Sequence, residues 1–272
     1  MGAVVKQTIF CVGAAFLFLA CQVAGDRSEA SAPEIAAGKA STVKIAASGD
    51  GGPPASGKAS SAPAETVNAA GLKLPATFKG TLPCADCEGI RYHLDLWPDG
   101  VFHLRHAWVG TPMVQDEIGR WRKDPSSPGI VFYGGRGMPL QFEVKGPQTI
   151  RLLDMQGRPI DSILPYELTS DGTLTPTDIS LGLHGMFRYM ADAARFEECL
   201  TGRSYPVTME GDYIKLERAY LEAEKPEPGA PLMASFEGDI TRKPAMEGDA
   251  LVPTVSVRRF IGVWPGQRCE GG

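Results

Sequence analysis

The sequence lacks the features that mark nucleic-acid-binding proteins, membrane-spanning proteins and the common enzyme families. Its 272 residues carry a net charge of -5 and contain no block of basic residues, which argues against a nucleic-acid partner. An apolar run from Thr8 to Ala20 is too short to span a bilayer. There is no Gly-x-Ser-x-Gly elbow, no His-Glu-x-x-His helix and no phosphate-cradling loop. We therefore predict no catalytic residues and a protein that is not an enzyme.

The N-terminal segment indicates export. The apolar run follows Lys6 and ends in Phe18-Leu19-Ala20-Cys21, with small residues directly before the cysteine. This ending resembles the lipobox of bacterial lipoproteins, in which the cysteine becomes the lipidated first residue. We predict a signal peptide over residues 1–20 and lipid on Cys21, and ordinary cleavage after Ala24 is the alternative.

The next segment, residues 21–73, is rich in Ala, Gly, Ser and Pro and shows no apolar periodicity. Such a segment buries too little apolar surface to offset the entropy of ordering it. We predict a disordered tether of about 40 Å typical reach between the lipid and the folded protein.

Four of the six cysteines remain if Cys11 is removed with the signal and Cys21 carries lipid. An even number of cysteines in an oxidising compartment favours disulfides. The simplest pairing joins Cys84 to Cys87 and Cys199 to Cys269.

The motif Cys84-Ala85-Asp86-Cys87 admits three chemistries. Its sulfurs can form a small disulfide ring, exchange electrons with another thiol pair, or offer two soft ligands to Cu(I) or Zn(II). A redox enzyme of the thioredoxin type places such a pair at a helix N-terminus. Here the flanking residues are typical of strands, and the acidic Asp86 and Glu88 would raise a thiol pKa, so the redox-enzyme interpretation is disfavoured.

A copper site needs further donors besides Cys84 and Cys87. Three histidines follow within the next residues, but the register of the predicted hairpin puts His93 and His103 on its outer face and His106 at the end of its inner face. We expect these histidines to be solvated strand residues, which leaves Cys84 and Cys87, and at most His106, as candidate metal ligands. The sequence has no Met-rich string or His run to strengthen the copper interpretation.

Residues 74–170 predict a small antiparallel barrel. The segments 92–97 and 101–106 flank Pro98-Asp99-Gly100, a hairpin signal, and about eight short strands follow one another without room for crossover helices. The inner face of this hairpin is apolar and fits either a packed core or a small hydrophobic ligand. We interpret the acidic Asp86, Glu88 and Asp95 as solubilising residues. The apolar inner-face residues are Tyr92, Leu94, Leu96, Phe102 and Leu104.

Residues 179–272 predict three strands, a helix over 212–224 and two further strands. This is the element order of an OB-fold. Asp212 is the expected N-cap of the helix, whose apolar positions are Ile214, Leu216, Tyr220 and Leu221. A Cys199–Cys269 disulfide would close a loop of about 70 residues and contribute roughly 4 kcal/mol.

The stretch FKGTLPCADCEGI, followed by a strand, an Asp-Gly turn, a second strand, Gly119-Arg120-Trp121 and later Asp154 to Ile160, resembles the N-terminal domain of the NlpE lipoprotein family. The resemblance implies a lipocalin-like barrel on an outer-membrane lipoprotein, associated with copper homeostasis, surface adhesion and the envelope-stress response. The C-terminal half resembles the OB-like domain of that family, with Cys199 and Cys269 where its disulfide is expected.

The expected function is therefore sensing or buffering in the bacterial envelope. The lipid on Cys21 would hold the protein in the outer membrane, facing the periplasm, and an inner-membrane signalling protein is the expected partner. Copper is the one cofactor that the resemblance suggests. A periplasmic binding protein for a small hydrophobic ligand or lipid is the alternative function, and the sequence does not predict an oligomeric state.

Overall fold

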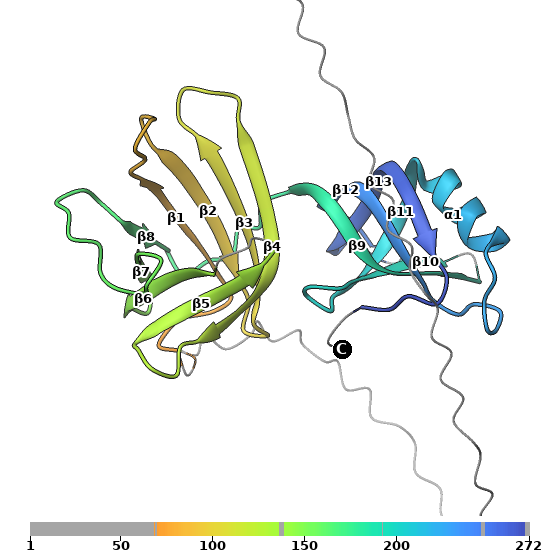
Figure 1. Cartoon of the computed structure of the whole chain (residues 1–272), viewed down its shortest axis with the longest axis horizontal. Helices are drawn as coiled ribbons and strands as arrows, with labels where there is room; N and C mark the ends of the chain where they lie inside the picture. The colour runs from red at the N-terminus through yellow and green to blue at the C-terminus, as the bar shows by residue number, and fades with distance from the viewer. Residues whose placement is uncertain (1–67, 69, 136–138, 192, 246–247, 270–272) are drawn as a thin grey trace, which may run out of the picture. The chain divides into compact units, whose positions relative to one another are not determined.

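The structure is a computed structural model that describes residues 68, 70–135, 139–191, 193–245 and 248–269 (Figure 1). The predicted signal peptide, Cys21 and the tether up to residue 67 lie outside the described residues. Within the described part of the chain, no helix is both long and apolar enough to cross a bilayer. The fold is mainly β, with an eight-stranded barrel followed by a five-stranded barrel, as predicted.

The first barrel is an antiparallel meander that closes on itself. Each strand pairs with the next, and β8 pairs back to β1 through Lys79 and Thr169. Closure leaves no open sheet edge. The strands are β1 (Ala76–Leu82), β2 (Ile90–Leu96), β3 (Val101–Trp108), β4 (Val114–Lys123), β5 (Gly129–Gly134), β6 (Leu140–Gly146), β7 (Thr149–Leu152) and β8 (Glu167–Thr169).

The β2–β3 hairpin has the predicted register. Leu94 lies opposite Leu104, and the Trp97 amide donates to the Val101 carbonyl oxygen at 3.1 Å. Gly100 completes the turn with a φ of 80°, a conformation that glycine adopts without steric cost. The turn and the period-two alternation together fix which side chains enter the barrel.

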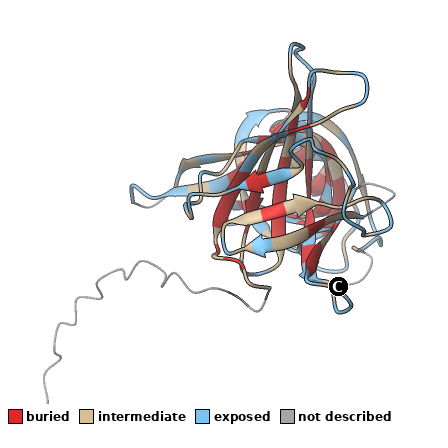
Figure 2. Cartoon of the chain, turned by 90° about the vertical axis from the view of Figure 1, so that its left-hand side faces the viewer, coloured by how far each residue is buried: buried red, intermediate tan, exposed pale blue. Residues whose placement is uncertain are grey.

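The interior of the first barrel is packed with side chains. Leu94, Phe102 and Leu104 are 0% exposed, so no water-sized space adjoins them. Phe132 lies in edge-to-face contact with both Phe102 and Phe142, at centroid separations of 5.0 and 5.5 Å. Figure 2 shows that the buried residues lie along the strands, whereas the loops are mostly exposed or intermediate. The apolar residues inside the first barrel therefore form a packed core rather than the wall of a ligand cavity.

The folded region extends back into the end of the predicted tether. Leu72 is 0% exposed, and the Lys73 amide donates to the Pro147 carbonyl oxygen at 3.0 Å. The Asn68 carboxamide oxygen accepts hydrogen bonds from the amides of Ala70 and Leu72, each at 3.0 Å. The domain therefore begins near Asn68 rather than at residue 74, because a single leucine in a polar segment packs against the barrel.

The second barrel has the OB element order that the sequence predicts. Its strands close in the order β10-β11-β13-β12-β9, with β11 and β13 parallel. The helix α1 (Tyr213–Glu222) follows β11 and lies against β11 and β13 (Figure 1). The strands are β9 (Ile179–Met190), β10 (Ala193–Glu198), β11 (Ser204–Gly211), β12 (Leu232–Pro244) and β13 (Leu251–Trp264).

The prediction for α1 was right about its position and wrong about part of its buried face. Ile214 and Leu221 are 58% and 56% exposed. The buried face consists of Tyr213, Leu216 and Tyr220 instead. Asp212 occupies the N-cap position without a side-chain capping bond. Its carboxylate instead accepts from the Phe260 amide at 3.1 Å and pairs with Lys215. Asp212 thus links the start of the helix to β13.

Candidate functional site

Cys84 and Cys87 are joined by a disulfide in the loop between β1 and β2, with their Cα atoms 5.4 Å apart. Neither cysteine lies at a helix N-terminus. Gly89 ends this loop with a φ of 147°, and a Cβ there would meet the Thr81 Cγ2 atom at 2.8 Å. Glycine is therefore required two residues after Cys87, where the chain turns back into the barrel.

The disulfide form of this loop offers no thiolate to a metal. On reduction, Cys84 and Cys87 would supply two soft ligands of the kind that Cu(I) prefers. The described residues contain no group of three or more His, Cys, Asp or Glu side chains placed to hold a metal ion. His106 is 4% exposed, and its ring contacts Tyr92 edge to face at 4.4 Å within the packed barrel. The structure does not bring His106 and the cysteines together as a ligand group.

The prediction of solvated histidines was wrong for His103 and His106, which are both 4% exposed. His103 lies on the outer face as expected, but the Trp97 ring covers it at a centroid separation of 4.8 Å. Burial lowers the pKa of His103 to about 4, although the nearby Asp95 carboxylate acts in the opposite direction. His103 is therefore neutral at physiological pH.

Asp95 is also buried, contrary to its interpretation as a solubilising residue. Its carboxylate accepts hydrogen bonds from the Thr77 hydroxyl at 2.6 Å and from the Thr177 amide at 2.9 Å. The Thr175 amide donates in turn to the Thr77 hydroxyl at 2.8 Å. The segment that follows the first barrel is thus bound along the outer face of β1 and β2, where it buries Thr77 and Asp95.

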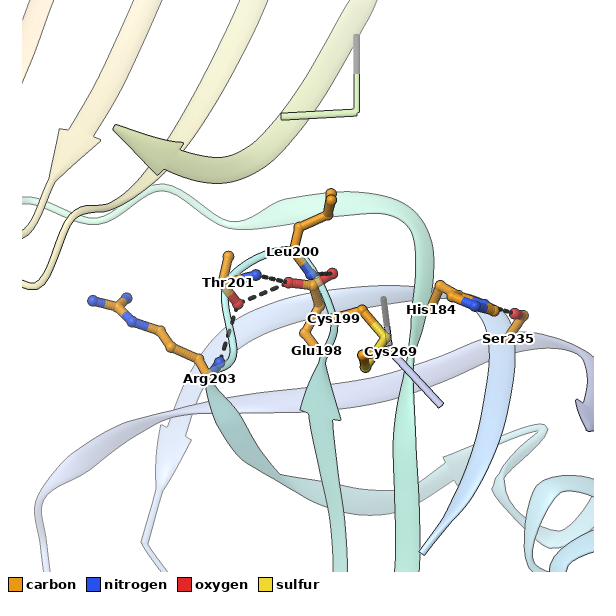
Figure 3. Close-up of a disulfide and its surroundings, with 8 residues drawn as sticks. All are labelled: His184, Glu198, Cys199, Leu200, Thr201, Arg203, Ser235 and Cys269. Atoms are coloured by element: carbon orange, nitrogen blue, oxygen red, sulfur yellow. Dashed lines mark hydrogen bonds between the residues drawn. A yellow bond between two sulfur atoms is a disulfide. The ribbon is translucent and has the colours of Figure 1, made fainter. Parts of the chain in front are cut away.

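The second disulfide joins Cys199, directly after β10, to Cys269 near the C-terminus (Figure 3). The Cα atoms are 5.2 Å apart, and the bond spans 70 positions of the sequence. The Cys199 amide donates to the His184 carbonyl oxygen at 3.0 Å, which fixes the cysteine beside β9. The disulfide therefore holds the segment that follows β13 beside β9 and the end of β10.

Glu198 organises the turn that presents Cys199, and the sequence analysis did not identify it. Its buried carboxylate accepts from the amides of Leu200 and Thr201 at 2.9 and 2.8 Å (Figure 3). It also accepts from the Thr201 hydroxyl at 2.7 Å. Gly202 follows with a φ of 69°, which lets the chain reverse into β11. The Cys-Leu-Thr-Gly segment after an acidic strand end was the available signal for this turn.

The comparisons with known proteins cover both barrels. The NlpE N-terminal domain matches residues 78–163, and the NlpE C-terminal OB domain matches residues 178–270. Lipoprotein NlpE of Escherichia coli (strain K12) is 32% identical over 208 residues, which cover 75% of this chain and 85% of the relative. The chain belongs to the NlpE lipoprotein family. This confirms the family resemblance drawn from the sequence.

Two solved structures are also similar to this NlpE family member. The crystal structure of the Cpx pathway activator NlpE from Escherichia coli has 30% sequence identity, covers 73% of this chain and 100% of that chain, and gives a TM-score of 0.32. The crystal structure of a putative lipoprotein from Shewanella oneidensis has 29% identity, covers 38% and 93% of the two chains, and also gives a TM-score of 0.32.

The two disulfides fall in different NlpE domains. Cys84 and Cys87 lie within the N-terminal match, and Cys199 and Cys269 lie within the C-terminal match. One disulfide closes a four-residue turn, and the other ties the segment after β13 to the end of β10. Loss of the first would change a local loop, whereas loss of the second would release a constraint on a whole domain.

Proposed function

We propose that this NlpE-type lipoprotein is anchored in the outer membrane through lipid on Cys21, faces the periplasm and reports envelope stress to an inner-membrane signalling protein. The observation that carries the proposal is that the sequence match to the Escherichia coli relative extends over both domains. The structure solved for NlpE from that organism is described as a Cpx pathway activator. A signalling role in the same kind of pathway follows from this relationship.

The fold supplies a reason for such a protein to respond to oxidative folding stress. In the chain-entropy description, a disulfide that closes a loop of 70 residues contributes about 4 kcal/mol to stability. A chain that fails to form the Cys199–Cys269 bond would therefore populate open forms of the second barrel much more often. Those forms would expose different surfaces to a partner.

Two other parts of the chain would respond to other stresses. Failure to attach lipid to Cys21, or to move the lipoprotein outward, would leave the protein at the inner membrane within reach of its partner. Copper is proposed to act at Cys84 and Cys87, which bind Cu(I) only after their disulfide is reduced. No catalytic step is part of this proposal.

A Cpx-responsive reporter in an Escherichia coli strain without its own NlpE tests the signalling role. Overproduction of the chain is expected to raise reporter output several-fold, and the Cys199→Ser and Cys269→Ser variants are expected to raise it at normal expression levels. Cys84→Ser combined with Cys87→Ser serves as the matched disulfide control. A chain that reaches the envelope and leaves the reporter unchanged at every expression level would refute the proposal.

Two measurements test the anchor and the metal. Mass mapping of the N-terminus, with membrane fractionation, is expected to find acylated Cys21 in the outer-membrane fraction, and a chain cleaved after Ala24 would contradict the anchor. Thiol counting on protein purified without oxygen, before and after adding Cu(I), tests the metal. A reduced pair that protects one Cu(I) from a competing chelator supports copper binding, whereas a pair that remains oxidised and takes up no copper rejects it.

A further inference from the structure

The outer face of the second barrel carries two arginines directly opposite each other. Arg188 of β9 and Arg195 of β10 are partners in the antiparallel register, and both are exposed. Like charges in directly opposed positions destabilise a sheet. Among the described residues, neither arginine forms an ion pair. The fold therefore retains a repulsive pair that substitution of either residue would relieve.

The Arg195 side chain is held in place from the neighbouring strand. Its Nε atom donates to the Ser204 hydroxyl at 3.2 Å, and its Nη2 atom donates to the Ser204 carbonyl oxygen at 3.4 Å. The hydroxyl of Ser204 accepts in this arrangement, so its own hydrogen is available to donate to a ligand. One arginine of the pair is thus oriented by β11 before any ligand binds.

A third guanidinium reaches the same place from the C-terminal end of the chain. Arg268 directly precedes Cys269, and the bond to Cys199 keeps this segment beside β10. Arg188, Arg195 and Arg268 line one surface cleft of about 460 Å³, together with Ser204 and Glu197. We refer to it as the three-arginine cleft.

The charge of this cleft selects the class of ligand. Three guanidinium groups and one carboxylate, that of Glu197, give a net charge of +2 among its described lining residues. A phosphate monoester carries a charge of about -1.5 to -2 at pH 7 and has three strong acceptor oxygens. The planar fork of an arginine binds such oxygens in pairs. A ligand with a single carboxylate would compensate only about half of the cleft's net positive charge.

We propose that the three-arginine cleft binds a phosphate monoester group, presented either by a free phosphorylated solute or by an anionic lipid surface. This inference goes beyond the proposed signalling function and does not depend on it. It assigns a role to the cross-strand arginine pair, whose repulsion would otherwise only lower the stability of the sheet. It also places one of the three charges under the control of the Cys199–Cys269 bond.

The test uses the full chain with Cys21→Ser, so that an attached lipid cannot carry it to a membrane. Calorimetric titration with glycerol 3-phosphate at low salt is expected to show saturable binding with one site. Arg188→Gln and Arg268→Gln should each weaken that binding tenfold or more, since each removes a charged donor. Arg218→Gln, an exposed arginine of α1, makes the same change of charge elsewhere and should leave the affinity within twofold.

Vesicles distinguish the two sources of phosphate. Binding to vesicles of phosphatidic acid in phosphatidylcholine, with weak binding of glycerol 3-phosphate, supports the cleft as a lipid-headgroup site. Saturable binding of the soluble ester, with no preference for these vesicles over pure phosphatidylcholine, supports a site for a free solute. Absence of saturable binding in both formats overturns the proposal, as does an equal loss in Arg218→Gln.

Thermal unfolding distinguishes a ligand-binding role of Arg188 from a role in stabilising the sheet. Because it removes a repulsion, Arg188→Gln should fold normally and unfold at a slightly higher temperature than the parent chain. Loss of binding together with unchanged or raised stability is the expected signature. An Arg188→Gln chain that unfolds at a clearly lower temperature would mean that the arginine stabilises the sheet, and it would overturn the assignment.

Discussion

Asp95 and Thr77 are joined by a 2.6 Å hydrogen bond on the outer face of the first barrel, where Asp95 is completely buried. The Thr177 amide donates to the same carboxylate. Asp95→Ala would leave these donors without their acceptor, at a cost of about 2 kcal/mol. We expect chemical unfolding to show this loss and protease digestion to show faster cleavage within residues 173–178. Asp86→Ala, in an exposed loop, should change neither quantity, and equal losses in both variants would contradict this role.

His103 makes the stability of the protein depend on pH. Burial lowers its folded-state pKa from 6.5 to about 4, while Asp95 and more weakly Asp116 and Asp99 raise it and Arg203 lowers it. Between these two values the unfolded chain binds a proton that the folded chain does not, so stability falls as the pH falls from about 6.5 to about 4. The contribution lost between pH 7 and pH 5 is about 2 kcal/mol.

Urea unfolding at both pH values checks this expectation. His103→Gln should reduce the difference in unfolding free energy between pH 7 and pH 5 by about 2 kcal/mol. The exposed His184 provides the comparison, because His184→Gln should leave that difference nearly unchanged. If the parent chain and the His103→Gln chain lose equal stability on acidification, His103 is not buried in its neutral form.

The parts of the fold that follow from local patterns could be predicted from the sequence. The Asp99-Gly100 turn and the alternation around it determine the β2–β3 register, and the strand-helix-strand order determines the second barrel. The burial of Asp95 and His103 could not be predicted in this way. Asp95 is covered by Thr177, which lies 82 positions away in a Thr- and Pro-rich joint, and His103 is covered by the Trp97 ring.

The candidate sites also differ in how far the sequence predicts them. The number of cysteines and the expected compartment favour disulfides, and the structure contains the simplest pairing of the four. The three-arginine cleft depends on a strand register and on a long-range disulfide that no local sequence pattern encodes. Arg188 lies opposite Arg195 because β9 ends at Met190 and β10 begins at Ala193, and no local sequence signal fixes these two positions. Arg268 joins them only because Cys269 is bonded to Cys199.

Gly185 and Gly182 provide a matched pair within β9. A Cβ at Gly185 would lie 2.1 Å from the Glu197 carbonyl oxygen and 2.7 Å from the Phe196 ring, so backbone would have to move. In the described part of the chain, no heavy atom outside Gly182 and its two adjacent residues lies within 4 Å of a Cβ at this position. We expect Gly185→Ala to cost about 3 kcal/mol or to prevent folding, and Gly182→Ala to stabilise by up to about 1 kcal/mol. Soluble yield and thermal unfolding of both chains measure this, and similar behaviour would show that β9 and β10 do not approach so closely.

The two disulfides should differ in their effect on stability, because they close loops of very different length. In the chain-entropy description, Cys199–Cys269 contributes about 4 kcal/mol and Cys84–Cys87 about 2 kcal/mol. Paired Cys→Ser variants, unfolded in urea without reductant, give the two values separately. We expect the Cys199 and Cys269 pair to lose clearly more stability, and we expect that loss in the second barrel. If the Cys84 and Cys87 pair loses as much, the β1–β2 loop contributes strain or contacts that loop length does not describe.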